Sequence, residues 1–380
     1  MYFKKVLGND LTKNMLLKEV STAKIPHAQL FEEYGGTSGL PMALAFVMYL
    51  FCENKQAKDS CGTCKNCIKM LKLSHPDLHF FFPTIGYTKE SGSKANFINF
   101  KSFIQQNAHI SIARWMTQNN MRTSGEIKNS DVVEINRISN LKSYEGQYKV
   151  FIIWRPENLN NVASNKLLKT LEEPTSKTIF ILVSENPNLI IKTITSRLQH
   201  KQIQNINTPA LLNYLENRFP DIQKNFLSTL IQKHNNNYNE ILLEISGIID
   251  DSKLEKIFVK WIRLCFLSNS KNNIIDLINC CEHLSSLDKN SQLYFTKITS
   301  EILRSTFLIH YNLPWNGPRQ FSDSDFNLIN FSKCVNNKNI IAISKLLDNC
   351  YFALNNRTPV NSKILFLDLS FSLGSLLHNN

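Results

Sequence analysis

Short apolar runs alternate with stretches of helical spacing along the first half of the chain. Residues 148–154 and 178–183 are two such runs, and a continuous apolar run of this length is typical of a strand buried on both faces of a parallel sheet. Between them, leucine and valine recur at helical spacing over residues 158–171. A strand, a helix and a second strand in this order form a βαβ unit. The pattern therefore predicts an α/β domain over residues 1–202.

Four further features belong to the same domain. Residues 25–45 have the layout strand, loop, helix, and the helix begins near Pro41. The aromatic residues 80–82 predict a buried strand, although aromatic rings can also stack on nucleic-acid bases. Residues 130–138 have the pattern of a capped amphipathic helix. Residues 84–130 form a polar insertion with sparse periodicity, part of which we expect to be mobile.

The pattern changes after residue 202, because from there on the apolar spacing is helical and no convincing strand occurs. Thr208 and Pro209 predict a helix start, with the threonine as N-cap and the proline at the first helical position. We expect a small helical unit over 203–247 and a larger helical bundle over 248–380. The helices expected in the bundle cover residues 254–266, 274–287, 293–313, 326–335, 340–354 and 364–377.

Composition and charge narrow the class of protein. Of the 380 residues, 43% are hydrophobic and 19% are charged, the profile of a globular rather than a disordered chain. Lysine and arginine number 43 against 31 aspartates and glutamates, and the net charge of +12 favours polyanions or acidic partners. The longest apolar stretch, residues 40–51, is too short to span a membrane, and the N-terminal residues lack an apolar signal region. We therefore expect a cytoplasmic protein with no membrane partner.

Four of the nine cysteines stand close together, namely Cys52, Cys61, Cys64 and Cys67, with the spacing C-x8-C-x2-C-x2-C. A reducing cytoplasm disfavours disulfides, and four thiolates at this spacing are typical of a tetrahedral zinc site. Because four thiolates leave no open position for water, the zinc is predicted to be structural rather than catalytic. The ion would fasten a small loop to the end of the preceding helix.

Two alternatives for this cluster stay open. The four cysteines can be free thiols of a loop, and His75 or His79 can replace one of them as a ligand. The other five cysteines stand in apolar helical surroundings and are expected to be core residues. They are Cys265, Cys280, Cys281, Cys334 and Cys350.

The first strand–loop–helix has the layout in which a phosphate-binding loop occurs, but the required residues are missing. A G-x-x-x-x-G-K-[ST] loop after this strand would put glycines at positions 33 and 38, lysine at 39 and a hydroxyl at 40. The chain has Glu33, Ser38, Gly39 and Leu40 there, with Gly36 between them, and no shift of register supplies the lysine. Phosphates and Mg²⁺ therefore lose their ligands, and Glu33 would repel a triphosphate.

The second half of an ATPase site is missing as well. After the strand over residues 150–153, an Asp-Glu pair that binds Mg²⁺ and activates water is expected at positions 154–155. Trp154 and Arg155 stand there instead. These two independent losses predict that the chain does not hydrolyse ATP by itself and that the degenerate loop supplies no cofactor-binding residues.

Four motifs occur in order along the first domain. They are Ile25-Pro-His-Ala28, the four-cysteine module, Asn165-Lys-Leu-Leu-Lys-Thr-Leu-Glu-Glu-Pro174 and Thr195-Ser-Arg197. Together they resemble the AAA+ clamp-loader family of bacterial DNA polymerase III and, because the ATPase motifs are absent, its delta-prime members. The resemblance covers residues 1–202 by motif and residues 203–380 only by helical architecture.

The resemblance implies a domain architecture and a zinc site. An AAA+ α/β domain with an inserted zinc module would cover residues 1–202, followed by a helical lid over 203–247 and an all-α collar for oligomerisation over 248–380. The four clustered cysteines match the zinc ligands of the family.

The resemblance also implies a role for Arg197. Ser196 and Arg197 match the first two positions of the family's Ser-Arg-Cys motif, with Leu198 in the third. In the family this arginine is a trans-acting finger that reaches the ATP of the neighbouring gamma/tau subunit. A guanidinium can neutralise charge that develops on a transferring phosphoryl group. The alternative is an ordinary surface arginine with weak ion pairs.

The function that the resemblance implies is mechanical. A delta-prime stator has no enzyme activity of its own and belongs to the DNA polymerase III holoenzyme, where ATP-driven gamma/tau and delta subunits load the sliding clamp onto primed DNA during replication. Gamma/tau and delta would be partners in a hetero-oligomer, and the clamp and the primer-template DNA would be reached through the complex. Two rival functions stay open: an active gamma/tau-type clamp-loader ATPase, and a stand-alone zinc-containing DNA-binding protein that uses the +12 charge.

Overall fold

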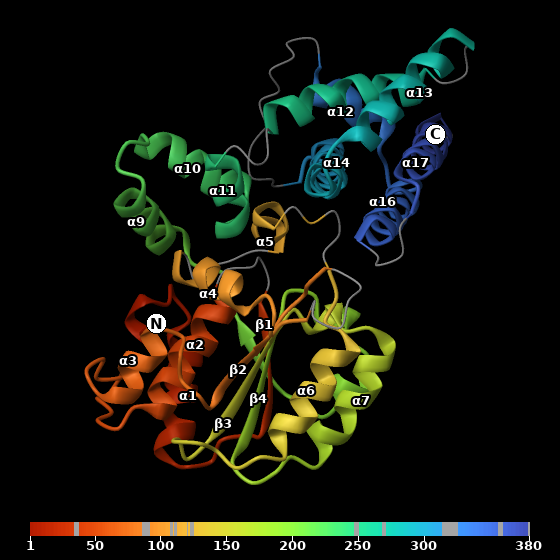
Figure 1. Ribbon diagram of the computed structural model, residues 1–380. Coiled ribbons are helices and arrows are strands. Elements are labelled where there is room, and N and C mark those ends of the chain that lie inside the picture. The colour runs from red at the N-terminus through yellow and green to blue at the C-terminus, as the bar shows by residue number, and fades with distance from the viewer. Residues whose placement is uncertain are drawn as a thin grey trace. The chain divides into compact units, whose positions relative to one another are not determined.

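Five strands form one parallel sheet in the first of two units of the chain, Met1–Leu242 (Figure 1). They are β1 Ala28–Glu33, β2 Leu78–Phe81, β3 Lys149–Trp154, β4 Thr178–Ser184 and β5 Gln199–Ile203. The strand order is β2-β3-β4-β1-β5, and every neighbouring pair is parallel. β1, β3 and β4 are buried along their whole length, as expected for central strands of a parallel sheet.

The structure is a computed structural model that describes most of the chain. The described residues are 1–33, 38–85, 92–106, 109, 112–119, 121, 125–246, 251–267, 271–313, 326–355 and 360–378. Among these residues, no helix is both long and apolar enough to span a membrane.

Helices cover both faces of the sheet (Figure 1). The helices on one face are η1 Phe3–Lys5, α1 Asp10–Ser21, α2 Gly39–Phe51 and α3 Lys65–Leu71. The helices on the other face are α6 Asn129–Ser139, α7 Asn161–Glu172 and α8 Lys192–Thr195. Neighbouring strand residues point to opposite faces, so Ile152 and Ile181 join one apolar core while Phe151 and Phe180 join the other. The α/β domain that the apolar runs predict is confirmed in its sheet and its layers.

Short 3-10 helices follow two of the strands. They are η2 Pro156–Asn158 after β3 and η3 Pro187–Leu189 after β4. Both lie at the edge of the sheet where the parallel strands end.

The segment over residues 84–130 contains two helices that its sparse periodicity does not predict, α4 Phe97–Gln106 and α5 Ile112–Gln118. Phe100 stacks on Phe82 with ring centroids 3.7 Å apart, and Trp115 meets both rings edge-on. The indole N–H of Trp115 donates to the carbonyl of Pro83 at 2.9 Å. The described part of this segment thus covers the end of β2 with aromatic side chains.

Three helices follow the sheet: α9 Thr208–Arg218, α10 Lys224–Lys233 and α11 Tyr238–Ile245. The N-cap of α9 is Asn207, whose side chain accepts from the amide of Ala210 at 2.9 Å. The prediction of Thr208 as N-cap is therefore wrong by one residue, because asparagine caps at least as well as threonine. The first unit ends within α11, and the domain boundaries at residues 202 and 247 stay a prediction.

The second unit, Leu243–Asn380, has helices and no strand among its described residues. Its helices are α12 Asp251–Phe266, α13 Lys271–Ser286, α14 Lys289–His310, α15 Leu328–Phe331, η4 Ser332–Cys334, α16 Ile340–Asn355 and α17 Ser362–His378. In its core the indole N–H of Trp261 donates to Ser370 Oγ at 2.7 Å, and Cys281 Sγ lies 3.3 Å from the same oxygen. The predicted bundle helices and core cysteines are confirmed, except that Cys334 is only half-buried.

Candidate functional site

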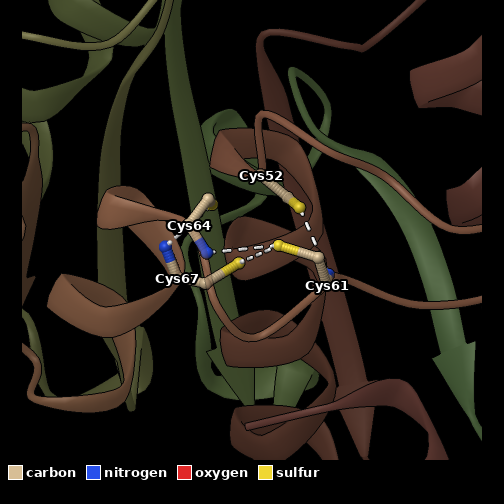
Figure 2. A group of neighbouring side chains, drawn as sticks. All are labelled: Cys52, Cys61, Cys64 and Cys67. Carbon is tan, nitrogen blue, oxygen red and sulfur yellow. Dashed lines mark hydrogen bonds between the residues drawn. The ribbon is translucent and has the colours of Figure 1, made fainter.

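Four cysteines meet where α2 ends and α3 begins (Figure 2). Cys52 is the C-cap of α2, Cys64 is the N-cap of α3, Cys67 lies in the first turn of α3, and Cys61 lies in the loop between the helices. Their Sγ atoms all lie within 4.8 Å of one another. Sulfur atoms that hold one zinc ion tetrahedrally at about 2.3 Å stand roughly 3.8 Å apart. The four predicted ligands therefore lie together, and the cluster has the size to hold one metal ion.

Backbone amides support this cluster. The amides of Cys61, Cys64 and Cys67 donate to the Sγ atoms of Cys52, Cys61 and Cys64, at 3.3, 3.4 and 3.4 Å. The Cys64 amide, followed by that of Thr63, lowers the pKa of the Cys61 thiol to about 6, whereas burial raises the pKa of the Cys67 thiol. A cation among the four sulfurs would stabilise all of them as thiolates. The donor set and its amides thus suit a closed metal site.

Neither His75 nor His79 joins the cysteines. His75 stacks on Phe51 with ring centroids 4.1 Å apart, and its Nδ1 accepts from the amide of Asp77. His79 packs against Phe151, and burial lowers the pKa of both imidazoles. The metal-ligating group found in the described part of the chain consists of the four cysteines alone, so the structure does not support a histidine ligand.

The loop that carries Cys61 also holds the N-terminal segment. The carboxylate of Asp59 accepts from the amides of Phe3 and Lys4, both at 3.1 Å. Gly62 has a φ of +78°, and a Cβ at this position would lie 2.3 Å from the hydroxyl of Tyr2. Glycine is therefore required for the loop to approach the segment. A metal ion that orders this loop would also order the segment that packs on α2.

A second group of ionisable residues lies where β3, β4 and β1 end. These strands are neighbours in the sheet, and open α/β sheets bind ligands at the carboxyl ends of their strands. Arg155 follows β3, Glu157 lies two residues further in η2, Glu185 follows β4, and Glu33 is the last residue of β1. We call these four residues the edge network.

Arg155 is the only cation of the edge network and is 5% exposed. Its Nε lies 3.2 Å from Glu157 Oε1, and its guanidinium also pairs with Glu185. Burial alone would lower the pKa of Arg155, but the carboxylates of Glu185 and Glu157 raise it above its ordinary value. The guanidinium thus finds its counter-charges within the chain, at the position where an ATPase holds carboxylates for Mg²⁺.

Glu33 reaches from the end of β1 to the start of α2. It is 3% exposed, and its Oε2 accepts a hydrogen bond from the amide of Gly39 at 2.6 Å. A Cβ on Gly39 would lie 2.7 Å from the same oxygen, so glycine permits the contact. Burial, followed by the charge of Glu185, raises the pKa of Glu33 to about 8, although the Gly39 amide and Arg155 act in the opposite direction. Burial therefore shifts Glu33 toward its protonated form, while the Gly39 amide and Arg155 favour the carboxylate.

Ser38 and Leu40, the other described residues of the degenerate loop that the sequence analysis names, are engaged within the chain. The hydroxyl of Ser38 donates to the carbonyl of Leu7 at 3.3 Å, and Leu40 is a buried apolar residue. Gly36 lies outside the described residues. A cavity of about 590 Å³ lies on the same side of the sheet as α2 and includes Lys4, Lys5 and Arg218 in its lining, but no residue of the edge network lines it.

Arg197 lies at the amino-terminal end of the parallel strands, opposite the carboxyl-terminal end that carries the edge network. It precedes β5, whose first residue, Gln199, pairs with Gln29, while the last residue of β5 pairs with Glu33. With about 3.3 Å per residue, Arg197 is roughly one strand length away from the degenerate loop. One arm of its guanidinium donates to the carbonyl of Thr193 at 2.5 Å, and the other pairs with Glu172. Arg197 therefore stands apart from the chain's own edge network.

Ser196 is the C-cap of α8, and its hydroxyl donates to the carbonyl of Thr193 at 3.2 Å. The hydroxyl is used locally, so Ser196 shapes the turn that presents Arg197. Leu198 is 7% exposed and belongs to the apolar core under α7.

Sequence reasoning did not single out Asp59, Glu157, Glu172 or Glu185. Glu185 directly follows the buried strand β4. Open α/β sheets bind ligands at the carboxyl ends of their strands, so a charged residue at this point could have been predicted to lie near a binding site. Glu172 belongs to the Leu-Glu-Glu-Pro run of the resemblance, but only the fold brings it to Arg197.

Comparisons with known proteins identify relatives of this chain. The family model described as "DNA polymerase III, delta subunit" matches residues 8–207, more than half of the 380-residue chain. The chain is 25% identical to DNA polymerase III subunit delta′ of Bacillus subtilis over 52% of its own length and 48% of the relative. It is 28% identical to the subunit delta′ of Yersinia pestis over 53% of its length and 48% of the relative. In both cases the chain spans about half the length of the curated relative that it matches.

One further relative carries a different subunit name. DNA polymerase III subunit tau of Bacillus subtilis is 27% identical over 58% of this chain and 32% of its own length.

Proposed function

Because this chain belongs to the family of DNA polymerase III delta subunits, as a clamp-loader member of the delta-prime type, we propose that it is the stator of a clamp loader. In this role it helps ATP-driven gamma/tau and delta subunits to load the sliding clamp onto primed DNA during replication. Gamma/tau and delta are its partners in a hetero-oligomer, and it meets the clamp and the primer-template DNA through that complex. The expected location is the cytoplasm.

The proposed stator does not hydrolyse ATP itself. The edge network supports this part of the proposal, since Arg155 lies where Mg²⁺ would need carboxylates, and Glu33 covers the amide of Gly39. The chain also has no lysine or arginine between Ala28 and Lys55. A triphosphate would therefore meet carboxyl groups and find no cation to clamp its β- and γ-phosphates.

Arg197, with Ser196 shaping its turn, is the proposed trans-acting finger. The observation that carries this proposal is the position of Arg197 at the amino edge of the sheet, about one strand length from the chain's own degenerate loop. An arginine there lies away from the position where its own chain would hold a phosphate, and its half-exposed guanidinium is held by Glu172 and by the carbonyl of Thr193. Exposed ion pairs of this kind are weak, so a phosphoryl group of a neighbouring subunit can replace Glu172.

The four-cysteine cluster is the proposed zinc site, with Cys52, Cys61, Cys64 and Cys67 as ligands. A set of four thiolates is closed, so the ion is structural and supplies no reaction chemistry. Its proposed task is to order the loop whose Asp59 holds the N-terminal segment.

The proposed architecture follows the family: an AAA+ domain over residues 1–202, a lid over 203–247 and a collar over 248–380. The collar would join the chain to gamma/tau and delta by helix packing.

The similarity to a tau subunit favours a second candidate, an active gamma/tau-type ATPase. The two candidates differ in what the purified chain does alone. A stator turns over no ATP, whereas an ATPase hydrolyses it with Mg²⁺ and needs no partner to bind it.

The experiment that tests the proposal is reconstitution with gamma/tau and delta, in which clamp loading and ATP hydrolysis are measured with and without this chain. Arg197→Ala should leave the fold intact and slow ATP hydrolysis at the neighbouring site by about 10³-fold, the scale of other arginine fingers. Arg137→Ala is the matched control, because Arg137 is an exposed arginine paired with Glu134 on its own helix. Wild-type rates with Arg197→Ala would exclude the finger.

A further inference from the structure

His200 lies in β5, shortly after Arg197, and both nitrogens of its ring are hydrogen-bonded. Nδ1 lies 2.5 Å from Oε1 of Glu32 in the neighbouring strand β1, and Nε2 lies 3.0 Å from the carbonyl oxygen of Thr195, the last residue of α8. An ionised carboxylate and a backbone carbonyl accept hydrogen bonds and donate none. Both ring nitrogens must therefore carry a proton to make the two bonds, and the geometry selects the positively charged imidazolium.

The surroundings of His200 favour this charged form. The carbonyl of Thr195 and the carboxylate of Glu32 raise the pKa of the imidazole above its ordinary value, although partial burial acts in the opposite direction. Glu32 is 7% exposed, so water competes little for its carboxylate. Both bonds are present below the raised pKa of His200, and one of them is lost as the pH rises through it.

Other ionisable groups on the neighbouring elements pair with one another. Lys201 follows His200 in β5 and points to the opposite face of the sheet, where it pairs with Glu19 of α1. Arg197, in the turn before β5, pairs with Glu172 of α7. The carboxylate in β1 is the charge that acts on the imidazole.

The turn that carries Arg197 is built on the carbonyl to which His200 donates. The carbonyl of Thr195 also accepts from the amide of Leu198 at 3.1 Å. The guanidinium of Arg197 donates to the carbonyl of Thr193 at 2.5 Å, in the same helix α8. A displacement of this turn would therefore move the backbone and the side-chain support of Arg197 together.

We propose that His200 is a positioning residue for Arg197, because its imidazolium ties the turn that carries the arginine to Glu32 of β1. The inference rests on the finger role of Arg197 under the proposed function, and adds to it a residue and a pH dependence. The finger is held in place while His200 is charged, and is held less firmly when the imidazole is neutral and only one of the two bonds can form.

The test is ATP turnover by the reconstituted complex at about pH 6 and about pH 9, on either side of the transition of a histidine. His200→Gln should be about tenfold slower than wild type at the lower pH, with little change in the KM for ATP, because a displaced finger affects the chemical step. At the higher pH the two rates should agree within about twofold, since neutral histidine and glutamine each keep one side-chain donor suited to this site.

Two further variants separate positioning from other roles. The double variant of His200→Gln and Arg197→Ala should be no slower than Arg197→Ala alone, because His200 acts only through the arginine. Lys192→Gln is the matched control, since Lys192 is an exposed cation of α8, and it should turn over ATP at the wild-type rate at both pH values.

Three results would overturn the inference and leave the finger in place. They are a wild-type rate of His200→Gln at the lower pH, a further slowing when His200→Gln is added to Arg197→Ala, and an equal slowing by Lys192→Gln. Wild-type rates with Arg197→Ala would instead remove the finger itself and this inference with it. Failure of the inference alone is therefore distinguishable from failure of the proposed function.

A second measurement needs no change at His200 and serves if His200→Gln does not fold. In the full wild-type chain, NMR titration of the His200 imidazole should give a pKa above the ordinary histidine value, and the Nε–H resonance of Arg197 should shift with the same midpoint. Glu32→Gln should lower the pKa of His200, because a charged acceptor becomes neutral. An ordinary pKa in the wild type, or the same pKa in Glu32→Gln, would overturn the inference.

Discussion

The cysteine cluster and the edge network both gather ionisable side chains, but they differ in where the opposite charge comes from. The cluster brings four thiols within 4.8 Å, and backbone amides donate to three of the sulfur atoms. The edge network surrounds one buried guanidinium with the carboxyl groups of the same chain. Four thiolates need a cation from outside, whereas the edge network already contains its own.

The comparison distinguishes a site that needs a ligand, the cysteine cluster, from a site where internal ion pairs take the place of a ligand, the edge network. Four thiolates at this distance would repel one another without a cation, so the cluster has the donor set of a metal site. The buried charge of Arg155 is already paired with Glu157 and Glu185. These carboxylates occupy the guanidinium and would repel an anionic ligand. The edge where nucleotide-binding folds place their phosphates is thus filled from inside in this chain.

The largest effect is expected at the cysteine cluster. Removing the metal with a chelator, or changing Cys64→Ser, should cost several kcal/mol of folding free energy, because the ion orders the whole loop and its contact with the N-terminal segment. Metal analysis should find one zinc per wild-type chain and less in the variant. Cys334→Ser is the matched control, since Cys334 is a half-buried cysteine outside the cluster. Equal zinc content and equal melting temperatures in the two variants would contradict the metal assignment.

The next effect is expected at Arg155. Arg155→Met should lower the free energy of unfolding by about 3–5 kcal/mol, because it leaves Glu157 and Glu185 near one another without their cation. Urea unfolding measures this loss, and adding Glu185→Gln should recover part of it. Arg137→Met should change little, because Arg137 pairs with Glu134 on the protein surface. If Arg155→Met lowered the free energy of unfolding no more than Arg137→Met does, Arg155 would not be the cation that neutralises Glu157 and Glu185.

A pH dependence should follow from Glu33. Its pKa of about 8 in the folded chain lies above the ordinary glutamate value of 4.5, so between these values the folded state holds a proton that the unfolded state has lost. Stability from this group is complete below pH 4.5 and falls as the pH rises toward 8, by up to about 1.4 kcal/mol per pH unit. Glu33→Gln should remove this dependence, because glutamine has no proton to lose. Identical pH profiles of unfolding for the two proteins would refute the raised pKa.

The smallest effect is expected at the exposed pair of Arg197 and Glu172. Glu172→Gln should change the free energy of unfolding by less than about 1 kcal/mol, because water screens a pair of which both side chains are more than a third exposed. Thermal unfolding of the variant measures this change. If Glu172→Gln lowered the free energy of unfolding as much as Arg155→Met, the ion pair of Arg197 and Glu172 would stabilise the fold and would not be the weak, replaceable contact described above.

Much of the fold could be predicted from the sequence, because β3 and β4 are continuous apolar runs and α2 ends at the first of four closely spaced cysteines. β5 was missed. Its residues Gln199–Ile203 include Lys201, which is buried and pairs with Glu19 of α1. A buried lysine that is neutralised by a partner from a distant helix leaves no apolar pattern to detect.

The cysteine cluster and the edge network also differ in how far the sequence predicts them. The cysteine ligands are close in sequence, so their spacing alone brings them together. The edge network combines residues at or just after the ends of β1, β3 and β4, and its contacts depend on these strands being neighbours in the sheet. The sequence indicated that Glu33 and Arg155 stand in the wrong places for an ATPase, but not that they occupy one buried edge.

If the chain's own side chains fill this edge of the sheet, the wild-type protein should not bind nucleotide, and titration with ATP and Mg²⁺ is the decisive experiment. Isothermal calorimetry should give no binding heat at millimolar nucleotide, and the Gly39 amide should keep its hydrogen bond to Glu33. A saturable binding heat, together with a shift of the Gly39 amide resonance on addition of Mg-ATP, would contradict the claim.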